Sequence, residues 1–83
     1  MARQVVEAEA GGTVSKIECR EGERVARDQL ILTIELMKME IPIAAPVAGT
    51  LVQLLVGEGD IVTEGQVVAI LETTGPIGPN KDG

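Results

Sequence analysis

The chain has 83 residues, which is enough for one small domain and too few for two. It contains no Phe, Trp or Tyr and carries a formal net charge of −6, which argues against base stacking and against binding to nucleic-acid backbones or anionic membranes. Without histidine, the chain lacks the usual proton shuttle and the commonest metal ligand, so we expect neither a catalytic centre nor a metal site.

Cysteine content and hydropathy indicate the compartment. The single cysteine, Cys19, cannot form an intrachain disulfide, and we interpret it as a small core residue at a strand end rather than a reactive thiol. No apolar run approaches the roughly 20 residues that span a bilayer. The first residues also lack the apolar stretch of a signal peptide, so a cytoplasmic protein is expected.

The sequence matches itself after a shift of 37 residues, which aligns residues 12–35 with residues 49–72. Two copies are too few for a solenoid, so we predict two half-domains packed as one pseudo-symmetric unit. Seven of the 24 aligned positions are identical: Gly12/Gly49, Thr13/Thr50, Glu21/Glu58, Gly22/Gly59, Val25/Val62, Gln29/Gln66 and Glu35/Glu72.

Each copy contains the same succession of predicted elements. In the first copy an apolar-rich stretch over 12–19 leads into a Glu-Gly turn, and a short stretch around Val25 leads into a polar turn at 27–29. A longer strand over 30–36 follows. Short β-branched runs between turn residues are typical of a small β-sandwich or barrel, here with about eight strands in two sheets. The alternation of apolar and polar residues over 13–19 is incomplete.

The segment between the copies and the C-terminal segment each contain prolines. Residues 39–44 form a predicted strand, and Pro42 within it indicates an edge strand or a missing ladder bond. Pro46 indicates a turn. Residues 75–83 hold three glycines and two prolines, so we predict a folded domain over 1–74 and a flexible tail over 75–83.

Lys38 lies between the strands predicted over 30–36 and 39–44, where only a two-residue turn fits. Such a turn needs positive φ at Met37 and Lys38, which costs a non-glycine residue about 1 kcal/mol or more. A turn that breaks a local rule is typical of a functional site. The alternative is a strand lysine whose stem covers apolar surface while its amine reaches water.

Residues 35–40, Glu-Leu-Met-Lys-Met-Glu, resemble the signature of biotinyl domains, Glu-Ala-Met-Lys-Met-Glu. Residues 45–49 resemble the family's Ala-Pro-x-x-Gly, and residues 58–66 its Glu-Gly-Asp-x-Val-x-x-Gly-Gln. The resemblance covers about residues 5–73. It implies an all-β, barrel-sandwich hybrid fold, which is a flattened barrel of two four-stranded antiparallel sheets related by a pseudo-two-fold axis. It also implies the thumbless type of domain.

The resemblance implies a non-catalytic carrier, with biotin attached covalently to Lys38 by a biotin protein ligase. Met37, Met39, Glu35 and Glu40 would be the flanking residues that the ligase recognises. The domain, expected to be monomeric, would then carry carboxyl groups between the biotin carboxylase and the carboxyltransferase of a biotin-dependent carboxylase. One departure is Leu36, which stands where the family usually has Ala or Ser and could slow the ligase.

Two other functions share the same fold. A lipoyl carrier of a 2-oxo-acid dehydrogenase complex also displays a lysine, but lipoyl domains usually have Asp before that lysine and a small residue after it. An unmodified scaffold domain would not need the sequence Met-Lys-Met. An independent enzyme is disfavoured because the chain has no Ser/His or Cys/His pair and no phosphate-binding glycine loop.

Overall fold

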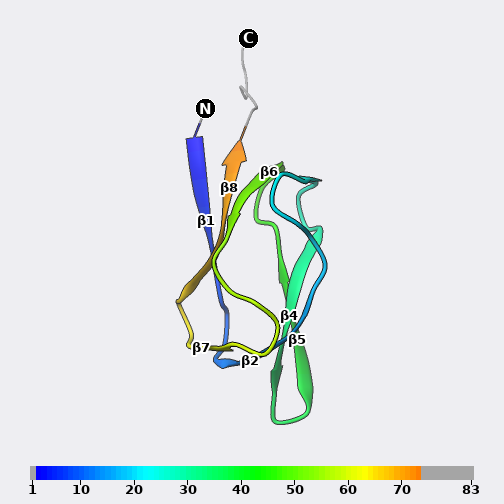
Figure 1. Ribbon diagram of the computed structural model, residues 1–83, viewed down its shortest axis with the longest axis vertical. Coiled ribbons are helices and arrows are strands. Elements are labelled where there is room, and N and C mark those ends of the chain that lie inside the picture. Colours follow the sequence, from blue (N-terminus) through cyan, green and yellow to red (C-terminus); the bar gives the residue numbers. More distant parts are fainter. Residues whose placement is uncertain (1, 74–83) are drawn as a thin grey trace.

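Eight β-strands form two four-stranded antiparallel sheets, as Figure 1 shows. This computed structural model describes residues 2–73, and the tail predicted over 75–83 lies outside the described residues. Within residues 2–73 there is no helix long and apolar enough to cross a membrane. The strands are β1 (Ala2–Glu7), β2 (Gly12–Ile17), β3 (Arg24–Val25), β4 (Leu30–Leu36), β5 (Met39–Ala44), β6 (Gly49–Leu54), β7 (Ile61–Val62) and β8 (Val67–Thr73).

The two sheets are related by the 37-residue repeat. One sheet has the strand order β1-β8-β6-β3 and the other has the order β5-β4-β2-β7. Adding 37 to the residue numbers converts β1, β2, β3 and β4 into β5, β6, β7 and β8, and so converts each strand order into the other. The predicted fold of two pseudo-symmetric half-domains is therefore confirmed. Pro42 lies on the edge strand β5, as predicted.

The core between the sheets is aliphatic. It is built from both copies, and burying each large side chain contributes about 1.5–3 kcal/mol. Cys19 is 2% exposed and belongs to the core, as the sequence predicts. The largest fully buried side chains are Ile31, Leu32, Ile34, Ile43, Leu51 and Leu71.

A β-bulge explains the incomplete alternation in the first copy. The pairing of β2 with β4 shifts between Val14 and Lys16, so an extra residue, Ser15, enters the strand. Val14 is buried, but Ser15 and Lys16 are both exposed, and the next inward position is Ile17. The pairing of β6 with β8 shifts at the equivalent place. The inward and outward positions therefore cannot be assigned by simple alternation.

Identical residues in the two copies hold equivalent turns. The Glu58 carboxylate accepts a hydrogen bond from the Ile17 N–H at 3.0 Å, and the Glu21 carboxylate accepts one from the Leu54 N–H at 2.8 Å. Each glutamate thus ties a turn to the neighbouring strand end. Gly49 has a different role, since a Cβ there would lie 2.6 Å from the Glu72 carbonyl oxygen. These repeated residues serve the fold.

Candidate functional site

Lys38 lies at the end of the hairpin formed by β4 and β5. The last residue pair of the hairpin is Leu36 with Met39, and the two residues between them have positive φ, 52° at Met37 and 65° at Lys38. Positive φ at both central residues defines a type I′ turn. The predicted two-residue turn is therefore present. Figure 1 shows this hairpin projecting at the end of the molecule opposite the two termini.

Packing below the turn holds this conformation. Each non-glycine residue in the left-handed region costs about 1–2 kcal/mol. Ile34 on β4 is fully buried, and its strand partner is Ile41 on β5, two residue pairs from Leu36 and Met39. Ile43, further along β5, is 1% exposed. Each buried isoleucine contributes about 1.5–3 kcal/mol, so the strands fix the turn although its residues disfavour it.

The residues at the turn are exposed and largely apolar. Met37 is 87% exposed, Met39 is 65% exposed, and Leu36 is 39% exposed. Lys38 is also exposed, and neither of the two ion pairs found among residues 2–73 involves it. A lone amine framed by exposed thioether side chains suits contact with another protein better than it suits the fold of this one.

Two carboxylates lie beside the turn. Glu35 on β4 is the direct strand partner of Glu40 on β5, and both are exposed. Because side chains alternate along a strand, they point to the face opposite that of Leu36 and Met39. Like charges directly across a strand pair are destabilising. This strand pairing brings all five predicted site residues, Glu35, Met37, Lys38, Met39 and Glu40, to one hairpin end.

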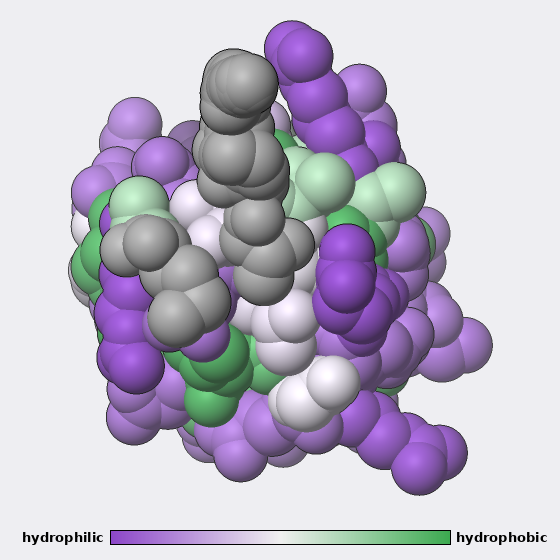
Figure 2. All heavy atoms as spheres, turned by 90° about the horizontal axis from the view of Figure 1, so that it is seen from above, coloured by the Kyte–Doolittle hydropathy of each residue, from purple (hydrophilic) through white to green (hydrophobic). Residues whose placement is uncertain are grey.

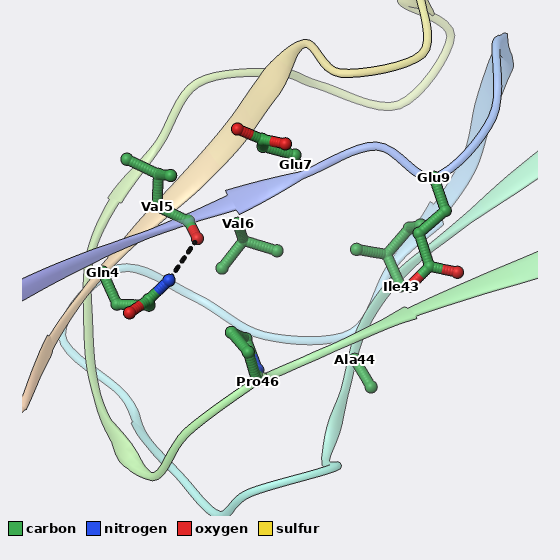
Figure 3. Close-up of a pocket in the computed structure, with 8 residues that line it drawn as sticks. All are labelled: Gln4, Val5, Val6, Glu7, Glu9, Ile43, Ala44 and Pro46. Atoms are coloured by element: carbon green, nitrogen blue, oxygen red, sulfur yellow. Dashed lines mark hydrogen bonds between the residues drawn. The ribbon is translucent and has the colours of Figure 1, made fainter.

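A groove elsewhere on the molecule carries no reactive group. It lies between the edge strands β1 and β5, has a volume of about 360 Å³, and is far along the strands from the turn. Figure 3 shows Val6 pointing toward Pro46 across it, while Glu7 points to the other side of β1. The polar side chains of the groove are Gln4, Glu7 and Glu9, and its lining holds no Ser, Cys or Lys. Its lining is Gln4, Val5, Val6, Glu7, Glu9, Ile43, Ala44 and Pro46.

The remaining candidate chemistry is inert. The Cys19 thiol donates to the Leu30 carbonyl oxygen at 3.3 Å, and burial raises its pKa, which makes the reactive thiolate scarcer. No group of three or more His, Cys, Asp or Glu side chains in the described part of the chain is placed to hold a metal ion. Of the two exposed lysines among the described residues, Lys16 lies within β2 and pairs with Glu18, whereas Lys38 lies at the hairpin end with no ion pair.

The comparisons with known proteins identify the family to which this fold belongs. The chain belongs to the biotin/lipoyl attachment family, whose family model is described as "Biotin-requiring enzyme" and matches residues 3–71. Carrier domains of this family are generally non-catalytic.

Relatives include both biotinylated and lipoylated proteins. The biotinylated protein TB7.3 homolog of Mycobacterium leprae is 33% identical over 66 residues, which cover 80% of this chain and 93% of that protein. A probable dihydrolipoyllysine-residue succinyltransferase component of the 2-oxoglutarate dehydrogenase complex of Schizosaccharomyces pombe is 38% identical over 77 residues. That match covers 86% of this chain and only 17% of the longer protein.

Solved structures show the same division. The urea carboxylase of Kluyveromyces lactis matches with a TM-score of 0.81 and 26% identity, over 87% of this chain and 6% of that chain. The lipoyl domain of the 2-oxoglutarate dehydrogenase complex of Azotobacter vinelandii matches with a TM-score of 0.69 and 29% identity, over 84% of this chain and 99% of that chain. The chain is thus a biotin/lipoyl attachment domain, a fold that serves both groups.

Proposed function

We propose that Lys38 is the attachment residue of this domain, that the attached group is biotin, and that the domain is a carboxyl carrier of a biotin-dependent carboxylase. The observation that carries the proposal is the exposed Lys38 at a two-residue turn between two exposed methionines. The biotinylated relative that matches over 93% of its own length supports biotin, as does methionine on both sides of the lysine.

Attachment requires an amide bond between the carboxyl group of biotin and Lys38 Nζ. A biotin protein ligase would activate the carboxyl group with a nucleoside triphosphate, and the carboxyl oxygen would leave with the attached phosphate group as the C–N bond forms. The Lys38 ammonium group becomes a neutral amide, so the net charge of −6 becomes −7. Neither Glu35 nor Glu40 forms an ion pair with Lys38 among residues 2–73, so neither is placed to act as the base. The ligase must accept the proton.

When bound, biotin supplies the carboxyl-carrying chemistry, and this chain supplies the position. The hairpin holds Lys38 beyond the body of the domain, where a flexible arm can reach a biotin carboxylase and then a carboxyltransferase. Tethering of this kind gives an effective concentration on the order of millimolar at each site. No side chain of the domain needs to take part in the transfer.

The test is the intact mass of the purified protein after co-expression with a biotin protein ligase and biotin. We expect one biotinyl increment on the wild type and none on Lys38→Arg, which keeps the charge but removes the attachment nitrogen. Lys16→Arg is the matched control, because Lys16 is an exposed strand lysine paired with Glu18, and it should be modified fully. An increment on Lys38→Arg would refute the assignment.

A lipoyl carrier is the second candidate, and the lipoyl domain of known structure and the 38% identical relative support it. The same proteins co-expressed with a lipoate ligase and lipoate distinguish the two. A lipoyl increment without a biotinyl one would replace biotin in the proposal. No increment from either ligase would point to an unmodified scaffold of the same fold.

A further inference from the structure

Four exposed residues form a row across the outer face of the sheet that carries Lys38. In the strand pairing, Ile61 on β7 faces Thr13 on β2, Thr13 faces Glu35 on β4, and Glu35 faces Glu40 on β5. Directly paired residues point to the same face and lie about 5 Å from strand to strand, so the row is about 15 Å long. We call it the tip row. It crosses the sheet where the Lys38 hairpin begins to project.

The internal repeat provides a second row for comparison. The equivalent positions in the other sheet are Arg24, Thr50, Glu72 and Arg3, which are paired in the same order. We call these four residues the terminal row. The Arg3 Nε lies 3.9 Å from a Glu72 carboxylate oxygen. Figure 2 views the molecule from this end, where hydrophilic side chains dominate the periphery.

The two rows differ in charge although they occupy the same place in the fold. The terminal row has two arginines and one glutamate, so its carboxylate is balanced. The tip row has two glutamates and no cation, and Ile61 stands where the terminal row has Arg24. Ile61 is 79% exposed, so its side chain adds almost nothing to the core.

The tip row is therefore unfavourable for folding. Paired like charges destabilise a sheet, and an exposed isoleucine gains little burial. The terminal row shows that the same position in the same fold can be filled by balanced charges. A surface that combines unbalanced carboxylates with an exposed apolar side chain is complementary to a partner that brings cations and an apolar depression.

The family resemblance already implies that the ligase recognises Glu35 and Glu40. We propose that the ligase that modifies Lys38 covers the whole tip row, with Ile61 as an apolar contact two strands beyond Glu35. The inference rests on the proposed attachment at Lys38. An unmodified lysine carries its amine only four methylene groups from the backbone. The reactive centre of the ligase must therefore reach the turn itself, which brings the adjoining row within the area that the ligase covers. The later partners meet a longer arm and can stay further away.

The proposal defines the ligase surface chemically. Arginine or lysine side chains should face Glu35 and Glu40, and an apolar depression about 10 Å away, two strand spacings from Glu35, should receive Ile61. Such charge pairs at the edge of an interface act mainly on association and are screened by salt. The apolar contact should be insensitive to salt.

The experiment measures kcat/KM for ligation of the purified domain by biotin protein ligase. Ile61→Arg and Glu40→Arg each introduce the residue that the terminal row has at that position. We expect each to lower kcat/KM at least tenfold, mainly by raising KM, and Glu40→Arg to weaken its salt dependence. Ile61→Leu should restore most of the rate. The matched controls are the reverse exchanges in the terminal row, Arg24→Ile and Arg3→Glu, which should stay within twofold.

The outcomes separate this inference from the proposed function. If the wild type is ligated and the tip-row variants, shown by urea unfolding to be folded, are ligated as fast, the docking surface is wrong and the attachment site stands. Equal losses in the tip-row and terminal-row variants would also overturn it. If neither biotin protein ligase nor lipoate ligase modifies the wild type, the proposed function fails and the docking surface fails with it.

Discussion

Met37 occupies a backbone conformation that its side chain disfavours. Its φ of 52° lies in the left-handed region, where Asn is better tolerated, and type I′ turns favour Asn at this position. We expect Met37→Asn to raise the free energy of unfolding by about 1 kcal/mol. The same change should slow ligation of Lys38, because it removes an 87% exposed side chain placed beside the reacting amine. Urea unfolding and ligation kinetics measure the two effects.

Asp28 offers the matched control for this prediction. It too has positive φ, 70°, and the equivalent residue in the second copy is Gly65 with φ 86°. Asp28→Gly should relieve strain of a similar kind but leave ligation unchanged. The Asp28 N–H donates to the Ala45 carbonyl oxygen, just past the end of β5 that lies farthest from Lys38. If Met37→Asn stabilised the domain and left ligation at the wild-type rate, Met37 would have no recognition role.

At the scale of the strands and turns, the repeat gives both halves the same turn hydrogen bond, although Gln29 Nε2 also donates to Cys19 Sγ at 3.6 Å, where the second copy has Val56. The Gln29 side-chain oxygen accepts from the Ala26 N–H at 2.9 Å, and the Gln66 side-chain oxygen accepts from the Thr63 N–H at 3.1 Å. A hydrogen bond of this kind contributes about 0.5–1.5 kcal/mol. We expect Gln29→Ala and Gln66→Ala each to lower the free energy of unfolding by about 1 kcal/mol.

The double variant tests whether the halves are independent as well as equivalent. The two turns share no hydrogen-bond partner, so the losses should add, with an unchanged dependence on urea concentration. Gln53→Ala is the control, since Gln53 is exposed on β6 and should change stability by less than about 0.5 kcal/mol. Losses that differ by more than about 1 kcal/mol between Gln29 and Gln66 would contradict energetic equivalence of the halves.

The strands that are bounded by turn residues could be predicted from the local sequence. The strands over 30–36 and 39–44 have the predicted bounds, because a polar turn, a two-residue gap and a proline delimit them. Strand β1 was not predicted, since residues 2–7 share no identity with the equivalent residues 39–44. Its partner is β8, at the far end of the sequence.

The residues of the candidate site also differ in whether the sequence alone could identify them. Lys38 could be found from sequence because it lies between the two copies of the repeat and because its two-residue turn lacks the residues that such turns favour. Ile61 could not, because its neighbourhood depends on pairing between β7 and β2, residues far apart in sequence. The signal available was the alignment of Ile61 with Arg24, an apolar residue opposite a charged one in the repeat. Only the register shows that this difference lies beside Lys38.

At the scale of the whole molecule, the pseudo-two-fold symmetry places the Lys38 hairpin and the chain termini at opposite ends of the domain. The pair Leu36 with Met39 closes the hairpin at one end, and its equivalent, the pair Thr73 with Ala2, lies at the other end beside the termini. A domain built this way can be joined to other proteins without obstructing the turn. The matched segment is 17% of the length of one longer relative and 6% of another.

Two equivalent turns at opposite ends allow this polarity to be tested. The turn at residues 63–66 directly follows β7 and lies at the Lys38 end, where the Gly65 N–H donates to the Ala8 carbonyl oxygen. The equivalent turn at residues 26–29 lies at the terminal end, where the Asp28 N–H donates to the Ala45 carbonyl oxygen. A small folded protein with adjacent termini can be inserted between Glu64 and Gly65, or between Arg27 and Asp28, through short Gly/Ser linkers.

We expect the two insertions to cost similar stability, because the turns are equivalent and loop-closure entropy depends only on loop length. Their effects on ligation should differ. The insertion after Glu64 lies three residues from Ile61 and would occupy the space that a ligase on the tip row needs, lowering kcat/KM at least tenfold. The insertion after Arg27 should leave it within twofold. The two turns are equivalent in the fold, so the insertions differ only in the end of the molecule that each one crowds. Equal ligation rates for both would therefore mean that the ligase reaches Lys38 without covering the β7 side of the sheet.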